Sequence, residues 1–240
     1  MPESLHWRSF VVPKDGHAAD ECEDAVAGDP EAGRFAIADG ASESFAAGEW
    51  ARLLVDAFVG RGPSRDWLAE PRAVWLRAVA GQAVSWYAEE KLSAGGHATF
   101  VGLTTRVVAD QFDWEAVAVG DACLFHVVGG SLLSSFPLDR PTDFTSSPTL
   151  ISSRAGTPNW KVARGVLRPG EALLLATDAL AQCLLESAND RRFAGTGLLT
   201  MDHDDDFALW VAATRAAGKL RNDDVALGIV EFITEASGVA

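Results

Sequence analysis

Cysteine is scarce in this 240-residue sequence, which contains three. Cys22, Cys123 and Cys183 are odd in number, widely spaced, and lie in or beside apolar stretches, where a thiol behaves as a small hydrophobic group. This pattern excludes a disulfide framework and the spacing of a zinc site. The loops C-x5-R, G-x-S-x-G and G-x-x-x-x-G-K-[ST] are also absent, so the local signatures of several nucleophilic and nucleotide-binding sites are missing.

Basic residues are also few, with 20 Lys and Arg against 34 Asp and Glu, for a formal net charge of -14. Such a charge repels nucleic acid and acidic headgroups, so we expect neither nucleic acid nor a membrane as partner. The first residues, MPESLHWRSF, lack the basic and apolar regions of a secretory signal. No apolar run approaches the length of a transmembrane helix. We therefore expect a cytoplasmic protein, acting as a monomer.

The hydrophobic content of 48% is enough for one sizeable core, and we expect a single domain over residues 1–240. Apolar residues at helical spacing predict helices at 45–59, 74–92, 180–187 and 207–217. Strand-like patterns occur at 35–38, at 172–176 and at 225–233, and four more, at 98–108, 112–119, 124–128 and 131–136, predict an antiparallel meander. Segregated helices and antiparallel strands indicate an α+β fold of two packed sheets flanked by helices.

The segment 137–169 is rich in Ser, Pro and Thr and has weak periodicity. It is therefore predicted to be a long loop or flap, of the kind that more often carries function than packing. An insertion without a function remains an alternative.

Acidic residues stand at the edges of the most apolar strands. Asp39 follows Phe-Ala-Ile-Ala, Asp121 follows Val-Ala-Val-Gly, Asp178 follows Leu-Leu-Leu-Ala-Thr, and Asp223 precedes the final strand. A single Asp at such a place is more often a turn former or a helix cap. If the strands are neighbours, however, the four carboxylates converge and cannot all remain ionised unless protons or cations compensate them. Oxygen ligands without His or Cys favour Mg²⁺, Mn²⁺ or Ca²⁺ over Zn²⁺.

Five strings in the sequence resemble the ordered motifs of the metal-dependent protein phosphatases of type 2C, in their compact bacterial form. They are CEDA (22–25), FAIADGASES (35–44), VAVGDACLFHV (117–127), LLLATDAL (173–180) and RNDDVALGIV (221–230). They span nearly the whole chain in the family's order. The resemblance implies a four-layer α-β-β-α sandwich with two central antiparallel sheets, which agrees with the segment pattern.

The resemblance also implies a set of metal ligands. Asp39 is similar to the carboxylate that bridges two Mn²⁺ or Mg²⁺ ions, with the Gly40 carbonyl as a further ligand, and Asp178 and Asp223 resemble the other direct ligands. Asp24 corresponds to the family's N-terminal acid near the metals. The weaker candidates are its neighbour Glu23 and, for a third metal that we regard as doubtful, Asp121.

The implied activity is hydrolysis of phosphoserine or phosphothreonine in a phosphorylated protein, by a metal-activated water and without a covalent intermediate. Asp39 and Asp24 are then the catalytic candidates. The arginine that often grips the phosphate in this family has no match, since Ala19 occupies its approximate position. Lys14 and His17 are weak candidates for substrate binding, and Arg8 is a weaker one.

Two alternatives remain open from the sequence. Ala179, Gln182 and Ala226 depart from the family pattern, which favours a catalytically degenerate module that regulates or binds phosphoproteins. The missing arginine leaves substrate size open, so a two-metal hydrolase of small phosphate esters is the second alternative.

Overall fold

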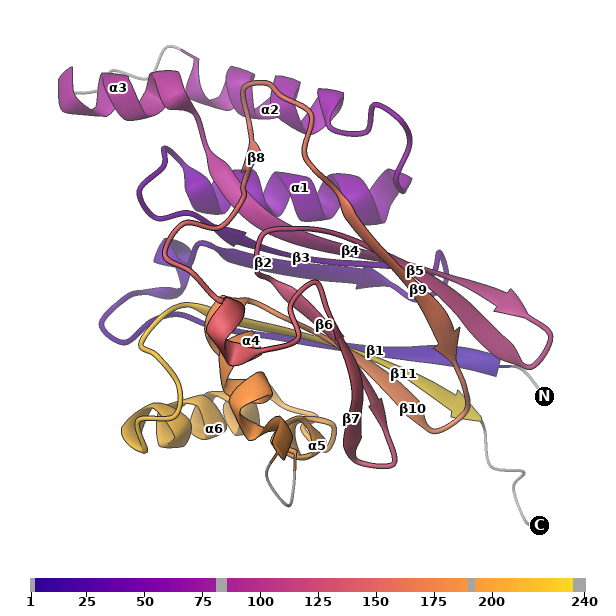
Figure 1. Cartoon of the computed structure of the whole chain (residues 1–240). Helices are drawn as coiled ribbons and strands as arrows, with labels where there is room; N and C mark the ends of the chain where they lie inside the picture. The colour runs from indigo at the N-terminus through magenta and orange to yellow at the C-terminus, as the bar shows by residue number, and fades with distance from the viewer. Residues whose placement is uncertain (1–2, 81–85, 190–192, 235–240) are drawn as a thin grey trace.

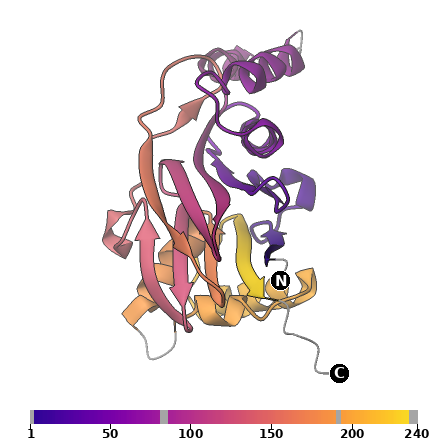
Figure 2. The ribbon, with the colours of Figure 1, turned by 90° about the vertical axis from the view of Figure 1, so that its right-hand side faces the viewer.

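Two antiparallel sheets lie face to face in the computed structural model, which describes residues 3–80, 86–189 and 193–234 (Figure 1). Helices cover the outer face of each sheet, so the chain has four layers: helices, sheet, sheet, helices. Figure 2 shows the same layers from the side. The predicted α+β sandwich is confirmed. In the described residues, no helix is long and apolar enough to cross a membrane.

The first sheet has the order β2-β3-β4-β5-β9, with the short β8 paired to β4. Its strands are β2 (Asp24–Asp29), β3 (Arg34–Gly40), β4 (His97–Val108), β5 (Gln111–Val119), β8 (Ile151–Ser152) and β9 (Lys161–Leu167). The second sheet has the order β1-β11-β10-β6-β7. Its strands are β1 (Glu3–Val12), β6 (Cys123–Val128), β7 (Ser131–Phe136), β10 (Glu171–Ala176) and β11 (Val225–Thr234).

The first sheet carries the helices α1 (Ala47–Arg61), α2 (Ala69–Val79) and α3 (Trp86–Ala94), and the second carries α4 (Asp178–Glu186), α5 (Gly195–Leu198) and α6 (Asp204–Ala216). Three short 3-10 helices, at Ala19–Glu21, Pro141–Asp143 and Ser187–Asn189, lie in the connections.

Hydrophobic clusters fill the three spaces between the four layers. Phe35 and Ile37 on β3 face the second sheet, whereas Ala36 and Ala38 pack against α1. In the second sheet, Leu173 faces the first sheet, and Leu174 faces α4 and α6 in the third cluster. Because each of these strands is covered on both faces, it appears in the sequence as a continuous apolar run rather than as an alternating one.

The predicted meander is wrong, because its four strands divide between the sheets. The β4–β5 hairpin belongs to the first sheet and the β6–β7 hairpin to the second. The chain crosses between them at Gly120, whose φ of +93° suits a residue without Cβ. Local periodicity does not show such a change of sheet, since each strand keeps its own pattern.

Two further predictions differ from the structure. The helix predicted at 74–92 is two helices, because Ala80 has an extended ψ of 126° that ends α2. The sequence pattern predicted that Trp86 shares a face with Trp75, but the side chain of Trp86 lies outside the described residues. The segment 137–169 is partly loop, but its end forms β9, which pairs with β5 over seven residues. The pattern also failed to indicate β1, β2 and α5.

Candidate metal centre

Two of the candidate acids face each other across a pair of strands. Asp24 opens β2 and is the register partner of Asp39 near the end of β3. Side chains alternate along a strand, so Asp39 lies on the same face as Phe35 and Ile37. That face meets the second sheet. Both carboxylates therefore point into the end of the space between the two sheets.

Three more carboxylates reach this end, two from connections and one from the start of a helix. Asp121 follows β5, Asp178 is the first residue of α4 after β10, and Asp223 precedes β11. Burial raises the pKa of Asp39 well above its usual range, and repulsion from Asp24, Asp178, Asp121 and Asp223 raises it further. The structure thus brings these five predicted acids into one electrostatic cluster, which we call the acidic centre.

Asp24 is a buried acid of the acidic centre. Burial raises its pKa strongly, a hydrogen bond from Thr177 opposes this, and repulsion from Asp178 and other neighbouring acids adds to it. The Thr177 hydroxyl also accepts the N–H of Ala226 at 2.9 Å. One carboxylate oxygen of Asp24, Oδ2, is buried and has no hydrogen-bond partner among the described residues. A buried unpartnered carboxylate oxygen is costly, and a bound cation would relieve that cost.

Asp121 and Asp223 show the same direction of shift. Burial raises the pKa of Asp121 to about 7, with repulsion from Asp178, while Arg221 opposes the rise. Burial and repulsion from Asp178 likewise raise the pKa of Asp223. The Oδ1 atom of Asp121 is a second buried carboxylate oxygen that has no partner in the part of the chain that the structure describes.

The adjacent acids Asp223 and Asp224 have different roles. Asp224 is buried, and its two oxygens accept the backbone N–H groups of Lys14 (2.8 Å) and Glu23 (2.9 Å). Asp223 uses Oδ1 to accept the N–H of Asp224 at 3.0 Å, and Arg215 holds its carbonyl at 2.5 Å. Asp224 therefore binds two backbone segments, whereas Asp223 interacts electrostatically with Asp178 of the acidic centre.

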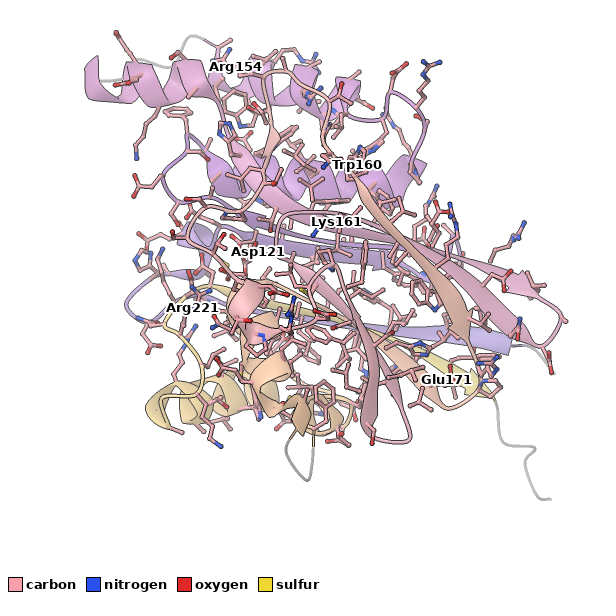
Figure 3. The ribbon with its side chains drawn as sticks, in the orientation of Figure 1. Asp121, Arg154, Trp160, Lys161, Glu171 and Arg221 are labelled. Atoms are coloured by element: carbon pink, nitrogen blue, oxygen red, sulfur yellow. The ribbon has the colours of Figure 1, made fainter. Side chains whose placement is uncertain are left out.

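Within the described residues, one cation forms an ion pair with an acid of the acidic centre. Arg221, in the connection between α6 and β11, donates from Nη2 to Oδ2 of Asp178 at 2.6 Å. Its side chain is 52% exposed and that of Asp178 is 20% exposed. Figure 3 shows Arg221 and Asp121 at the same end of the sandwich, opposite the end that carries Glu171.

The donor set of the acidic centre fits a hard divalent cation in its chemistry. It consists of carboxylate oxygens, two of which are buried without partners, and no His or Cys takes part. Within the ranges that the structure describes, however, no group of three His, Cys, Asp or Glu side chains is close enough to hold one ion. The acids interact at a distance, so the binding of one ion would require side-chain movements that bring their oxygens together.

The other predicted site residues lie at varying distances from this chemistry. Gly40 is buried at the end of β3, where its N–H donates to the Glu23 carbonyl at 3.1 Å. The Glu23 carboxylate accepts a hydrogen bond from Ser42. Lys14 contributes its backbone N–H to Asp224. His17 lies 3.9 Å from Glu21 and is not brought to the acidic centre.

Arg8, the other basic candidate, is held elsewhere: it donates to Asp202 and forms an ion pair with Glu231. The cysteines are buried and free. Burial raises the pKa of Cys22 to about 12 and that of Cys183 to about 11, and it also raises the pKa of Cys123. None of them is a thiolate nucleophile near neutral pH.

The departures from the family pattern are accommodated structurally. Ala179 has no positive φ and packs in the helical core below the second sheet, so a glycine is not required there. Gln182 donates to Glu186 at 3.3 Å, within α4. Ala226 lacks a hydroxyl, yet its N–H is bound by Thr177.

Sequence reasoning missed four residues of this site. They are Thr99, Thr177, Asp224 and Arg221. Thr99 is the register partner of Asp39 on β4, and its buried hydroxyl has no hydrogen-bond partner among the described residues. The Thr before Asp178 and the second Asp of the Asp223-Asp224 pair were visible signals. Arg221 had none, because its partner is 43 residues away.

A cavity of about 210 Å³ opens beside Asp121. Lys161, at the start of β9, and hydroxyl residues of the segment after β7 line it, among them Thr145 and Thr149. Figure 3 shows Lys161 near Asp121. A larger cavity, of about 460 Å³, is lined by Trp67 and Trp160 and includes none of the five acids.

Comparison with known proteins defines the class of fold. No family model matches the chain, and no curated protein sequence matches it. Among solved structures, its fold is that of the type 2C serine/threonine phosphatases. The five motifs resemble the same family.

Three solved structures illustrate the similarity. PppA, described as a key regulatory component of T6SS in Pseudomonas aeruginosa, is 20% identical, with a TM-score of 0.64 and coverage of 95% of this chain and 98% of that one. The catalytic domain of the serine/threonine phosphatase PstP, in complex with two manganese ions, is 16% identical, with a TM-score of 0.61 and coverage of 97% and 100%. The photosystem II phosphatase PBCP is also 16% identical, with a TM-score of 0.59 and coverage of 95% and 98%.

Proposed function

We propose that this chain is a Mn²⁺- or Mg²⁺-dependent serine/threonine protein phosphatase. The observation that carries the proposal is the acidic centre, in a fold shared with phosphatases: its buried oxygens Asp24 Oδ2 and Asp121 Oδ1 have no hydrogen-bond partner within residues 3–80, 86–189 and 193–234. Carboxylates arranged in this way are compensated either by protons or by a bound cation, and at a pH where they are ionised a cation is required. The manganese complex of PstP supports two divalent ions as that compensation.

In the proposed site, Asp39, Asp178 and Asp223 hold the metals, Gly40 adds a carbonyl ligand, and Asp24 lies beside them. The bound metals would supply an activated water and neutralise phosphoryl oxygens. Asp39 and Asp24 face each other and so position the reacting centre from two strands. Thr177 orients Asp24 through its hydroxyl. Asp121 lies between this centre and the cavity lined by Lys161.

The substrate is proposed to be a phosphorylated protein, with the cavity beside Asp121 accepting residues near the phosphate. Lys161, in that cavity, supplies a positive charge that the missing phosphate arginine would otherwise provide. The net charge of -14 supports neither nucleic acid nor an acidic membrane as partner. We also propose that the protein acts in the cytoplasm, as a monomer.

Hydrolysis of p-nitrophenyl phosphate and of a phosphothreonine peptide, with and without Mn²⁺, tests the proposal. We expect Mn²⁺-dependent turnover in the wild type and a loss of about 100-fold or more in kcat/KM for Asp39→Asn, since metal ligation contributes several kcal/mol to transition-state stabilisation. Asp56→Asn, at an exposed position of α1, is the matched control and should keep wild-type activity. Metal-independent turnover, or turnover unaffected by Asp39→Asn, would contradict the two-metal mechanism.

A regulatory module that binds phosphoproteins is the second candidate. The observation that favours it is the ion pair between Arg221 and Asp178, which occupies a proposed metal ligand. Retained Mn²⁺ binding and phosphopeptide binding, with no hydrolysis of either substrate, would support this function. Hydrolysis of the small ester but of no phosphopeptide would support an enzyme of small phosphate esters.

A further inference from the structure

Arg221 is placed to act on more than one acid of the acidic centre. Its guanidinium donates to Asp178 at 2.6 Å. Its positive charge also lowers the pKa of Asp121 and of Asp223, against the burial that raises both. Among the groups that shift the pKa values of Asp39, Asp121 and Asp223 in the described residues, Arg221 is the one with a positive charge.

The position of this guanidinium conflicts with a metal ion on the same carboxylate. A Mg²⁺ ion lies about 2.1 Å from its oxygen ligands and requires near-octahedral geometry. Arg221 Nη2 is already 2.6 Å from Oδ2 of Asp178, and its charge is permanent because guanidinium does not lose a proton in proteins. A divalent ion bound by that oxygen would be repelled by Arg221 at close range.

The side chain of Arg221 can move away from Asp178 while the backbone of the connection between α6 and β11 stays in place. It is 52% exposed, so solvent is available to it. The backbone on its C-terminal side is held by Arg215, which donates to the Asp223 carbonyl, and by Asn222, which accepts the N–H of Asp15 at 2.7 Å. Asp224 is fixed by two further backbone N–H groups. Displacement of Arg221 is therefore a side-chain movement.

We propose that Arg221 is a tethered cation that occupies Asp178 in the metal-free protein and is displaced when a divalent ion binds. Arg221 stabilises the acidic centre when no metal is bound, and it weakens metal affinity. The protein therefore binds the metal at a higher metal concentration than it would if the carboxylates had no arginine beside them. This inference rests on the metal-binding part of the proposed function and does not require catalysis.

Direct measurement of Mn²⁺ binding, by calorimetry and by electron paramagnetic resonance of free Mn²⁺, tests this role without substrate. At low ionic strength we expect Arg221→Gln to bind Mn²⁺ about tenfold more tightly than the wild type, because a repelling charge is removed. In EDTA, the same variant should have a lower melting temperature. Arg221→Lys, which keeps the charge, should have an affinity closer to that of the wild type.

Arg164→Gln is the matched control. Arg164 is also an exposed arginine paired with a carboxylate, Glu115, but on β9 and β5, away from the five acids. Its substitution should change neither Mn²⁺ affinity nor the melting temperature in EDTA. Mn²⁺ affinity that is equal or weaker in Arg221→Gln than in the wild type would overturn the inference.

The outcomes separate this inference from the proposed function. Tighter Mn²⁺ binding by Arg221→Gln, without hydrolysis by any form, would support the tethered cation and contradict the enzyme. Equal Mn²⁺ binding by both forms, with metal-dependent hydrolysis, would support the enzyme and contradict the tethered cation. Absence of Mn²⁺ binding in both forms would contradict both.

Discussion

At the scale of single residues, adjacent carboxylates in this protein have different tasks because their hydrogen bonds differ. Both oxygens of Asp224 accept backbone N–H groups, from Lys14 and Glu23, and these bonds join the segment before β2 to the start of β11. Asp223 accepts the N–H of Asp224 through Oδ1 and interacts electrostatically with Asp178 of the acidic centre. Two neighbouring Asp residues are chemically identical in the sequence, so their order in the motif was the sole guide to the ligand.

Substitution of these two residues should therefore have opposite effects. Asp224→Ala leaves the N–H groups of Lys14 and Glu23 without acceptors, and we expect a loss of about 2–4 kcal/mol in the free energy of unfolding. Asp223→Asn removes one of several repelling charges, so the metal-free protein should be at least as stable as the wild type, while Mn²⁺ binding weakens. Denaturant unfolding in EDTA and Mn²⁺ titration measure the two effects. Equal destabilisation by both changes would contradict this division of roles.

At the scale of elements, the contact between α1 and the ends of β2 and β3 positions Asp39. Gly40 follows Asp39, and a Cβ on it would lie 2.7 Å from the carbonyl carbon of Ala47, at the start of α1, and 2.9 Å from the Glu23 carbonyl oxygen. These are backbone atoms and cannot rotate away. The close approach of helix and strand thus requires glycine beside the proposed bridging ligand.

Gly40→Ala should push α1 from β3, at a cost of about 1–3 kcal/mol from overpacking, and should weaken Mn²⁺ binding by displacing Asp39. Gly60→Ala is the matched control: Gly60 is an exposed residue of α1 where an added Cβ meets nothing within 4 Å. It should stabilise the helix by about 0.5–1 kcal/mol and leave Mn²⁺ binding unchanged. Wild-type stability and metal binding in Gly40→Ala would show that the contact does not position Asp39.

At the scale of the whole molecule, the acidic centre couples folding to pH. Folding raises the pKa of Asp24, Asp39, Asp121 and Asp223, that of Asp121 to about 7. Between about pH 4 and pH 7, the folded protein therefore holds protons that the unfolded chain has released. In this window the metal-free protein loses stability as the pH rises.

We expect the melting temperature in EDTA to be higher at pH 6 than at pH 8, and Mn²⁺ to raise it at pH 8 by binding the ionised acids. Asp121→Asn should reduce the pH dependence and raise the melting temperature at pH 8, by about 2–4 °C for each kcal/mol of repulsion removed. Asp110→Asn, at an exposed position in the turn between β4 and β5, is the control and should behave as the wild type. A melting temperature that rises from pH 6 to pH 8 in EDTA would contradict the shifts.

The layers of the fold were predictable because they depend on local patterns. The continuous apolar runs at β3 and β10 indicated strands covered on both faces, and the helical stripes of α1 and α6 indicated outer layers. Less regular elements were missed: β1 and β2 gave no clear pattern, and the change of sheet at Gly120 depends on how two hairpins pack rather than on either hairpin alone.

By itself, the sequence determined which acids stand at strand ends and in what order, since those positions follow from apolar runs and the turns that end them. The tertiary structure alone decided which carboxylate oxygens are buried without partners, which of Asp223 and Asp224 serves as an anchor, and that Arg221 reaches Asp178. Burial and hydrogen bonding arise between segments far apart in the chain. Local sequence patterns contain no information about the distance between those segments.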